Sequence, residues 1–213
     1  MLGLEKDREK LIEHLRREID DERVLEAMAR VRRELFVPGL SRRFAYDDRP
    51  LPIGEDQTIS QPFIVALMTQ ALVLTGTEKV LELGTGSGYQ AAILAELASQ
   101  VITVERLQKL AQTARSTLKK LSYTNIEVHL ATRTLGWPAA APYDAIMVTA
   151  AAPRIPQGLL EQLIVGGRLV IPVGSRWEQD LLQVVRKKDR IAVKNLTHCR
   201  FVPLIGEEAW SEE

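Results

Sequence analysis

The feature that most constrains the fold of this chain is a glycine-rich turn that follows a short apolar segment. Its residues are, in order, Val80, Leu81, Glu82, Leu83, Gly84, Thr85, Gly86, Ser87, Gly88 and Tyr89. Glycines at alternate positions let the backbone take positive φ and let a ligand approach closely, and a helix beginning near Tyr89 points its unpaired N–H groups into the same space. The sequence therefore predicts a strand, a turn and a helix, with a flat polar ligand over the turn.

The spacing of the glycines indicates which ligand to expect. Dinucleotide sites prefer Gly-x-Gly-x-x-Gly, whereas Tyr89 stands here where the last glycine would fall. A second predicted strand ends at Glu105, 21 positions after Gly84, and an acid at that place binds the ribose hydroxyls of an adenosine. Glu82, the glycines and Glu105 together suggest S-adenosylmethionine. Taken singly, each feature is also explained by a tight turn or a solvated strand end.

Strand and helix patterns alternate after the turn, which predicts a doubly wound α/β sheet, mostly parallel, with helices on both faces. The seven predicted strands are Lys79–Leu83, Val101–Glu105, Ile126–Leu130, Ala145–Val148, Arg168–Val173, Leu181–Val185 and a segment around Ile191–Leu204. The predicted helices between them are Tyr89–Leu97, Leu107–Leu121 and Pro156–Gln162. The last two strands flank a polar turn at residues 187–190 and are expected to pair antiparallel.

The N-terminal third is expected to be helical and then irregular. Apolar residues at helical spacing predict two amphipathic helices before Pro38, the second capped by Asp20 or Asp21. Residues 42–62 are predicted to lack regular structure because prolines and a glycine interrupt them, and a loop of this length is usually functional. A mostly apolar helix is predicted from Phe63 to about Leu74.

Charge and cysteine content narrow the classes of partner. Lysine and arginine (28) balance aspartate and glutamate (28), so no basic excess favours nucleic acid or an anionic membrane. Cys199 alone permits no internal disulfide, and the three histidines form no metal-ligand pattern. We expect a cytoplasmic protein without a signal or membrane segment. We also expect one domain over residues 1–213, with helices and a catalytic loop over 1–75 and the α/β core over 76–213.

The chain resembles the protein-L-isoaspartate O-methyltransferase family from about Arg33 to Gly206. The segments that carry the likeness are Arg33–Pro38, Tyr46–Gly54, Gln57–Pro62, the glycine turn, Leu135–Pro138, Ala141–Ile146, Thr149–Pro153 and Arg200–Leu204. The glycine turn is shared by many methyltransferases, whereas residues 58–60 and 150–153 are more specific. The resemblance implies a class I methyltransferase fold, which is Rossmann-like.

The resemblance also implies the reaction. A methyl group moves from S-adenosylmethionine, leaving S-adenosylhomocysteine, to the free α-carboxylate of an isoaspartyl residue in a damaged protein. The methyl ester then collapses to a succinimide that can hydrolyse to normal aspartate. A carboxylate with a pKa of about 4 is ionised at neutral pH, so no general base is needed. Isoaspartyl proteins and peptides are the implied partners, and we expect a monomer.

The resemblance assigns roles to individual residues. Ser60 is the implied catalytic residue, whose hydroxyl, with that of Thr58, holds one oxygen of the substrate carboxylate. The implied cofactor site consists of Thr58, Ile59, Glu82, Gly84, Thr85, Gly86, Ser87, Gly88, Tyr89, Glu105, Arg106, Thr132 and Arg133. The implied substrate site consists of Thr58, Thr149, Ala150, Ala151 and Val202. Two alternatives stay open: Ser60 as the N-cap of the following helix, and residues 149–153 as a tight strand-to-helix connection.

The sequence departs from the family pattern at two places. Ala131, Thr132 and Arg133 stand where the family usually has Gly-Asp-Gly, and Asp56 replaces a usual glycine. Loss of a charge-assisted hydrogen bond from the adenine edge would weaken cofactor binding by about 1.5–3 kcal/mol. A catalytically weak relative that binds isoaspartyl peptides or a partner protein is therefore an alternative. A methyltransferase for RNA or a small molecule is a third.

Overall fold

The structure is a computed structural model that describes residues 2–211. Its α-helices are α1 (Leu2–Leu15), α2 (Glu22–Arg30), α3 (Pro62–Ala71), α4 (Tyr89–Ala95), α5 (Gln108–Lys120) and α6 (Gln157–Glu161). Its 3₁₀ helices are η1 (Arg33–Leu35), η2 (Gly39–Phe44) and η3 (Pro138–Ala140). Its strands are β1 (Leu51–Gly54), β2 (Gln57–Ile59), β3 (Lys79–Leu83), β4 (Gln100–Glu105), β5 (Ile126–Leu130), β6 (Tyr143–Val148), β7 (Leu163–Gly174), β8 (Gln179–Arg186) and β9 (Ile191–Cys199).

A seven-stranded sheet in the order β5-β4-β3-β6-β7-β8-β9 forms the centre of the fold. The pairs from β5 to β7 are parallel, and β8 and β9 are added antiparallel. The predicted doubly wound, mostly parallel sheet is confirmed. β3 and β5 match the predicted bounds, whereas β6, β7 and β8 extend beyond them.

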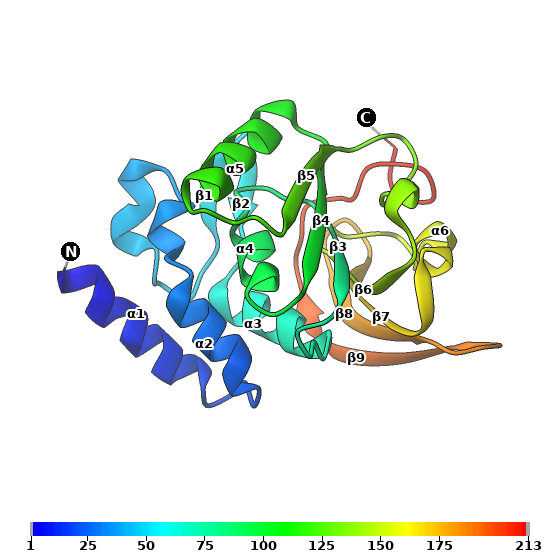
Figure 1. Cartoon of the computed structure of the whole chain (residues 1–213), viewed down its shortest axis with the longest axis horizontal. Helices are drawn as coiled ribbons and strands as arrows, with labels where there is room; N and C mark the ends of the chain where they lie inside the picture. Colours follow the sequence, from blue (N-terminus) through cyan, green and yellow to red (C-terminus); the bar gives the residue numbers. More distant parts are fainter. Residues whose placement is uncertain (1, 212–213) are drawn as a thin grey trace.

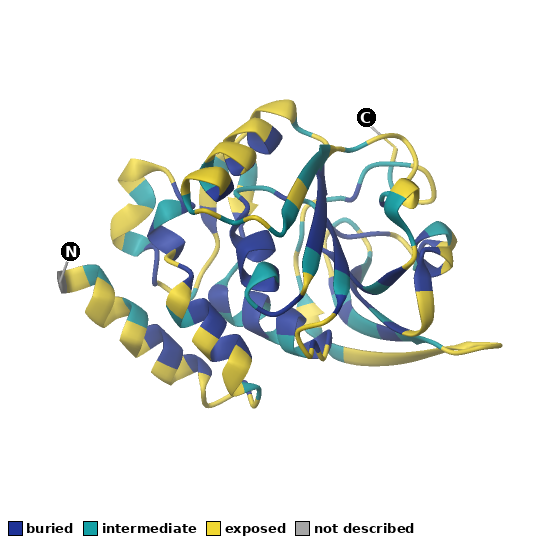
Figure 2. Ribbon diagram, in the orientation of Figure 1, coloured by how far each residue is buried: buried dark blue, intermediate teal, exposed yellow. Residues whose placement is uncertain are grey.

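Both faces of the sheet are covered, as the near-continuous apolar strands require. On one face, Val80, Val101 and Met147 pack with the buried side chains of α1 to α4. On the other face, Leu81, Ile102 and Ile146 pack with Leu159 and Leu160 of α6. Figure 1 shows this layering, with α4 and α5 on one side of the sheet and α6 on the other. In Figure 2 the central strands are mostly buried, whereas β9 carries exposed residues along its length.

The N-terminal helices follow the predicted pattern with one adjustment. Asp21 caps α2, since its side chain accepts the backbone N–H of Arg23 at 3.1 Å. Ile19 lies beyond the end of α1 but is still only 2 % exposed. The first helix, α1, ends at Leu15 because the chain must then turn to bring α2 back against it. Figure 1 shows α1 and α2 packed together at the outer edge of the molecule.

The prediction that residues 42–62 are irregular is wrong. η2 covers part of this segment, and β1 and β2 pair antiparallel as a hairpin in which Pro52 faces Thr58. Proline is tolerated because this is a two-stranded ribbon, where no third strand needs its missing N–H. The turn of the hairpin contains Glu55 and Asp56, both with positive φ, at 50° and 53°. Positive φ at both central residues is typical of the type I′ turn that suits hairpins.

The expected strand to Leu204 ends earlier, at Cys199. Residues 200–205 leave the sheet and lie along the segment after β6, with a parallel bridge between Ala151 and Pro203. The backbone N–H of Ala151 donates to Val202, and Leu204 donates back to Ala151, both at 2.8 Å. The chain thus changes partner from β8 to residue 151, which carries Val202 to the carboxyl edge of the sheet. Within residues 2–211, no helix has the length and apolar character to cross a membrane.

Candidate active site

A cavity opens at the carboxyl edge of β3, β4 and β6, where the strand order reverses. The chain leaves β3 toward β4 and β5 and then returns to β6 on the other side of β3, and open α/β sheets bind ligands at such a point. The empty space in the cavity and its open mouth together is about 970 Å³. Its walls come from residues 57–60, 65, 83–87, 89–90, 104–107, 131–132, 134–136, 149–150 and 202–205.

The glycine turn forms the floor of this cavity. Gly84, Gly86 and Gly88 have φ values of 96°, 52° and 88°, a region that side-chain-bearing residues disfavour. A Cβ added at Gly84 would collide with Oγ1 of Thr149, so only glycine lets β3 and β6 approach closely here. Gly88 is the N-cap of α4 and does not line the cavity. The predicted strand–turn–helix unit is confirmed.

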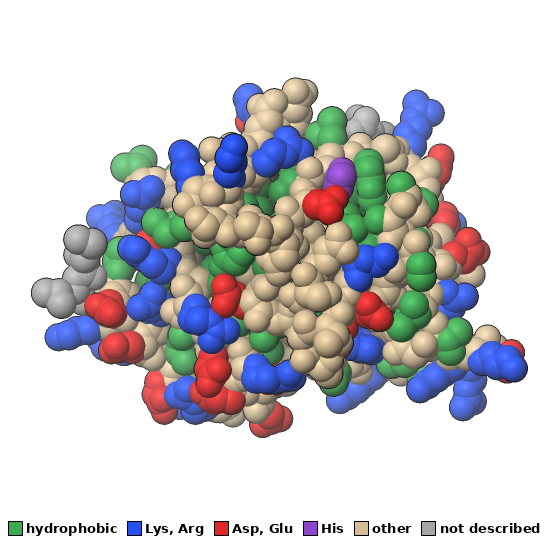
Figure 3. Space-filling view, in the orientation of Figure 1, with side chains coloured by type: hydrophobic (Ala, Val, Ile, Leu, Met, Phe, Trp, Pro, Cys, Tyr) green, Lys and Arg blue, Asp and Glu red, His purple; other side chains and the backbone are tan. Residues whose placement is uncertain are grey.

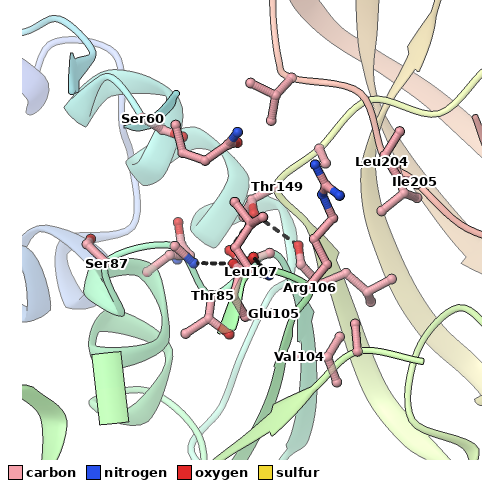
Figure 4. A pocket seen from close by; sticks show the side chains of 18 of the residues that line it. Ser60, Thr85, Ser87, Val104, Glu105, Arg106, Leu107, Thr149, Leu204 and Ile205 are labelled. Carbon is pink, nitrogen blue, oxygen red and sulfur yellow. Dashed lines mark hydrogen bonds between the residues drawn. The ribbon is translucent and has the colours of Figure 1, made fainter. Parts of the chain in front are cut away.

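Glu105, at the end of β4, presents its carboxylate to the cavity. Oε2 accepts the backbone N–H of Gly86 at 2.8 Å, and Oε1 accepts that of Leu107 at 2.9 Å. The side chain is thereby fixed against the glycine turn, and the residue is only 6 % exposed. Figure 4 shows Glu105 in the middle of the site, below Thr149, with Ser60 and Ser87 on one side and Leu204 and Ile205 on the other. This position suits a carboxylate that accepts hydrogen bonds from two neighbouring hydroxyls.

Glu82 lies beneath the floor and outside the cavity lining. It is fully buried, and its Oε2 accepts a hydrogen bond from Oγ1 of Thr103 at 2.5 Å. Oγ1 of Thr103 is in turn 2.6 Å from Oγ1 of Thr85, a residue of the turn. Burial raises the pKa of Glu82 to about 8, the charge of Glu105 adds to this, and the bond from Thr103 opposes it. Glu82 therefore supports the turn from below and is largely protonated at neutral pH.

Thr149 joins β6 to the glycine turn. Its hydroxyl donates to the carbonyls of Leu83 and Gly84 at 2.9 and 2.8 Å. Ala150 also lines the cavity, whereas Ala151 does not, because its backbone groups bind the segment 202–204. Val202, whose carbonyl accepts the N–H of Ala151, lines the cavity beside Ala150 and is 36 % exposed. The structure thus brings Thr149, Ala150 and Val202 together around one opening.

Ser60 lines the cavity at the end of the β1–β2 hairpin. The alternative that it caps the following helix is wrong: Gln61 is the N-cap residue of α3, and Oδ1 of Asp48 accepts the N–H of Phe63 at 2.8 Å. The carbonyl of Ser60 accepts a hydrogen bond from Arg33. Among the described residues, its hydroxyl has no hydrogen-bond partner. The Ser60 hydroxyl is therefore available to a ligand.

The segment after β5 borders the cavity only in part. Ala131 and Thr132 line it, and the Thr132 hydroxyl donates to the carbonyl of Thr134 at 3.2 Å. Arg133 does not line it; its carbonyl instead accepts the N–H of Glu207. The predicted cofactor residues Glu82, Gly88 and Arg133 and the predicted substrate residue Ala151 thus lie outside the lining. The other predicted residues are Thr58, Ile59, Gly84, Thr85, Gly86, Ser87, Tyr89, Glu105, Arg106, Thr132, Thr149, Ala150 and Val202, and all of them line it with Ser60.

Several lining residues were missed from the sequence. They include Gln57, Val65, Gln90, Leu107, Leu135 and Gly136, and the segment Pro203–Ile205. Leu107 had a signal, since it lies two residues after the acid at the end of β4. Gln90 had none, because its amide is buried and donates to Thr69 at 3.0 Å, as an ordinary core residue would.

The donor set of the site fits an adenosine-containing ligand. It combines a glycine turn, a fixed carboxylate at the next strand end and apolar walls from Leu107 and Leu135. Groups of three or more histidine, cysteine, aspartate or glutamate side chains placed to hold a metal ion do not occur in the described part of the chain.

Comparisons with known proteins agree on one family. Residues 6–209 match the family model described as Protein-L-isoaspartate(D-aspartate) O-methyltransferase. The chain is 54 % identical over 212 residues to Protein-L-isoaspartate O-methyltransferase 1 of Syntrophobacter fumaroxidans, covering 99 % of each chain. It is 54 % identical over 210 residues to Protein-L-isoaspartate O-methyltransferase of Methanoculleus marisnigri, covering 98 % of this chain and 96 % of the relative.

Solved structures give the same result. A protein-L-isoaspartate O-methyltransferase superposes with a TM-score of 0.84 at 28 % identity, over 95 % of this chain and 67 % of that one. A Plasmodium falciparum structure, described as a putative protein-L-isoaspartate O-methyltransferase in complex with S-adenosyl-L-homocysteine, superposes with a TM-score of 0.79 at 27 % identity. That alignment covers 91 % of this chain and 95 % of the other.

Proposed function

Because this chain belongs to the protein-L-isoaspartate(D-aspartate) O-methyltransferase family, we propose that the cavity at the carboxyl edge of β3, β4 and β6 is its active site. The chain is an S-adenosylmethionine-dependent methyltransferase that methylates isoaspartyl residues and so begins their repair. The roles of its residues in that reaction are argued below from their positions.

The floor and one wall of the cavity hold the cofactor. Glu105 accepts hydrogen bonds from the two ribose hydroxyls. The N–H groups of Gly86 and Leu107 fix its carboxylate in the place from which it can do so. The glycine turn leaves room for the methionine part of the ligand. Thr132 stands at the adenine edge, where it offers a hydroxyl instead of a carboxylate. Glu82 contributes indirectly, through Thr103 and Thr85.

Ser60 orients the substrate. Its hydroxyl has no protein partner among the described residues and borders the same space as Thr58 and Thr149. A hydroxyl in this position donates to one oxygen of the substrate carboxylate and leaves the other directed at the methyl group. Alanine at position 150 and the exposed Val202 leave room for the main chain of the substrate. This free hydroxyl at the cavity wall is the observation that carries the proposal.

The chemistry requires alignment more than proton transfer. The cofactor supplies a methyl group on a positively charged sulfur, and a lone pair of the carboxylate oxygen forms the new C–O bond while the electrons of the C–S bond pass to the sulfur. The carboxylate is already ionised at neutral pH, which agrees with a cavity that holds no histidine. What Ser60 and the walls provide is orientation and exclusion of water around the anion.

Substitution of Ser60 tests this assignment. We expect Ser60→Ala to reduce methyl transfer to an isoaspartyl peptide by roughly 100-fold, because misorientation costs about this much. Binding of S-adenosylhomocysteine, measured by titration calorimetry, should stay unchanged. Ser41→Ala, on η2 and outside the cavity lining, is the matched control. The normal aspartyl peptide should accept no label from either protein. Full activity in Ser60→Ala would refute the role of the hydroxyl.

We further propose that the chain works as a monomer in the cytoplasm, folds as one domain over residues 1–213, and acts on isoaspartyl proteins without a nucleic-acid or membrane partner. Acidic and basic side chains lie together over the lower left and right of the face shown in Figure 3, although basic ones predominate at its upper left. The equal totals of 28 basic and 28 acidic residues support the expectation of no nucleic-acid partner. Sedimentation of the purified protein with and without isoaspartyl peptide tests the oligomeric state.

A further inference from the structure

A buried arginine lies directly behind Ser60. Arg33 belongs to η1, is 0 % exposed, and does not line the cavity itself. Its Nη2 donates to the carbonyl of Ser60 at 2.9 Å, and its Nε donates to the carbonyl of Ala45 at 2.8 Å. Its guanidinium carbon lies 5.0 Å from the centre of the Tyr89 ring, a residue of the cavity wall. Arg33 thus joins three segments that meet at the site.

This arginine is poorly compensated for a buried cation. No ion pair joins it to a carboxylate within residues 2–211, and its Nη1 has no hydrogen-bond partner there. Burial lowers the pKa of Arg33, although interactions with the hydroxyl of Tyr89 and with the carboxylate of Asp48 oppose the shift. Burying a charge without a paired counter-ion is costly. A buried residue that lowers the stability of the fold in this way is expected where it serves the function of the protein.

Arg33 works together with Asp48 on the turn that holds Ser60. Asp48 accepts Phe63 N at 2.8 Å and Gln61 Nε2 at 3.0 Å, so it fixes the residues that follow Ser60. Arg33 fixes the carbonyl of Ser60 itself. These two anchors hold the Ser60 backbone from both sides, which fixes the direction of its Cα–Cβ bond toward the cavity wall.

We propose that Arg33 is a positioning residue for substrate recognition, which holds the Ser60 backbone so that the Ser60 hydroxyl meets the substrate carboxylate. This inference rests on the proposed role of Ser60. The proposal also gives the positive charge of Arg33 a function. A cation directly behind the cavity wall attracts an anion in the cavity, and this attraction is stronger where water is excluded and the local dielectric constant is low. Arg33 touches neither substrate nor cofactor; its hydrogen bond acts through Ser60, and its charge acts on the cavity at longer range.

Two substitutions separate the parts of this role. Arg33→Lys keeps the charge but loses the fork that reaches two carbonyls, and Arg33→Met keeps most of the length but loses both charge and donors. Binding of an isoaspartyl peptide is measured by fluorescence anisotropy in saturating S-adenosylhomocysteine, where no transfer occurs. We expect the peptide to bind roughly 10- to 100-fold more weakly to Arg33→Met, with Arg33→Lys between it and wild type. The dissociation constant of S-adenosylhomocysteine should change less than twofold.

Arg168 provides a matched control. Its guanidinium also donates to two backbone carbonyls, those of Leu72 and Val73, at 2.8 and 2.9 Å, but neither of these two residues lines the cavity, whereas Ser60 does. Arg168→Met should lower stability without changing peptide affinity. If Arg33→Met weakens peptide and S-adenosylhomocysteine equally, or leaves peptide affinity unchanged, the inference is overturned.

A double-mutant cycle distinguishes failure of this inference from failure of the proposed function. If Arg33 acts through Ser60, Arg33→Lys should change peptide affinity less than twofold in a Ser60→Ala background, because the effects of coupled residues are not additive. Additive effects would show that Arg33 does not act through Ser60, while Ser60 keeps its role. If Ser60→Ala alone has no effect on peptide affinity or transfer, the proposed function of Ser60 fails first, and this inference fails with it.

Discussion

Asp48 caps the helix that follows Ser60, since its Oδ1 accepts the backbone N–H of Phe63 at 2.8 Å. The acceptor comes from 15 residues earlier in the chain, whereas helix caps are usually local. Because Asp48 provides the capping acceptor, the Ser60 hydroxyl is not needed to cap the helix. A residue that a helix would otherwise use at its start is therefore free to meet a ligand.

The cap predicts a stability effect. Asp48→Ala should lower the free energy of unfolding by about 1 kcal/mol, the usual effect of losing an N-cap acceptor, and should also weaken binding of the isoaspartyl peptide, because the turn holding Ser60 is released. Urea denaturation measures the first effect and peptide anisotropy the second. Asp47→Ala is the control, since the Asp47 side chain is half exposed and, within residues 2–211, forms an ion pair with Arg49 alone. An Asp48→Ala protein with wild-type stability would contradict the capping role.

Cofactor binding should depend on the carboxylate of Glu105. Glu105→Gln replaces one acceptor oxygen by a donor that faces backbone N–H groups, so S-adenosylhomocysteine should bind about 1.5–3 kcal/mol more weakly. Titration calorimetry gives the dissociation constant directly. Glu127→Gln on the neighbouring strand, where the side chain is 56 % exposed, should leave binding unchanged. Equal affinities of the Glu105→Gln and wild-type proteins would remove Glu105 from the ribose site.

The buried carboxyl of Glu82 should make stability depend on pH. Burial raises its pKa to about 8, so the folded state binds the proton more tightly than the unfolded state. The contribution of Glu82 is fully present below its unfolded pKa of about 4.3 and is lost as pH rises through about 8. Glu82→Gln mimics the neutral form and avoids this loss.

Urea denaturation from pH 5 to pH 8 measures the effect. The stability of Glu82→Gln minus that of wild type should increase with pH, by up to about 1.4 kcal/mol per pH unit, and should level off above pH 8. A difference that stays constant over this range would show that Glu82 has the same pKa in both states.

A substitution in the turn of the β1–β2 hairpin should increase the stability of the protein. Asp56 has a φ of 53°, and a non-glycine residue in the left-handed region is strained by about 1 kcal/mol. Asp56→Gly should therefore raise the free energy of unfolding by up to that amount, in spite of the greater freedom of glycine in the unfolded chain. Asp189→Gly, in a turn without positive φ, should not stabilise the protein. Thermal unfolding of both variants decides the matter.

The α/β core was predictable because its signals are local. The apolar strands, the glycine turn and Glu105 follow one another with fixed spacing, and topology brings their ends to one edge of the sheet. The bounds of β3 and β5 match the prediction for this reason. The shortfall at β7 arises because residues 164–167, which include Gly166 and Gly167, carry no strand pattern and form an irregularity between the pairs Tyr143–Leu163 and Ala145–Arg168.

What the sequence did not predict depends on contacts between distant segments. The β1–β2 hairpin contains Pro52, which argues against a strand, and it forms because Ile59 and Leu51 are buried against the helices. Asp48 reaches Phe63 and Arg33 reaches Ser60 across 15 and 27 positions, so no short window of sequence contains either pair. The absence of Glu82 and Arg133 from the lining likewise follows from the depth of one and the outward turn of the other.

The pairing of Ala151 with Val202 and Leu204 has a consequence for the order in which the protein becomes competent during synthesis. The glycine turn and Glu105 leave the ribosome before Val202, which lies 97 positions after Glu105. Pairings between distant segments form late, because the intervening chain must be ordered first. A nascent chain can thus carry Ser60 and build the nucleoside part of its site while the wall that residues 202–205 supply is still missing, so the cavity is closed on that side only after the rest of the site exists.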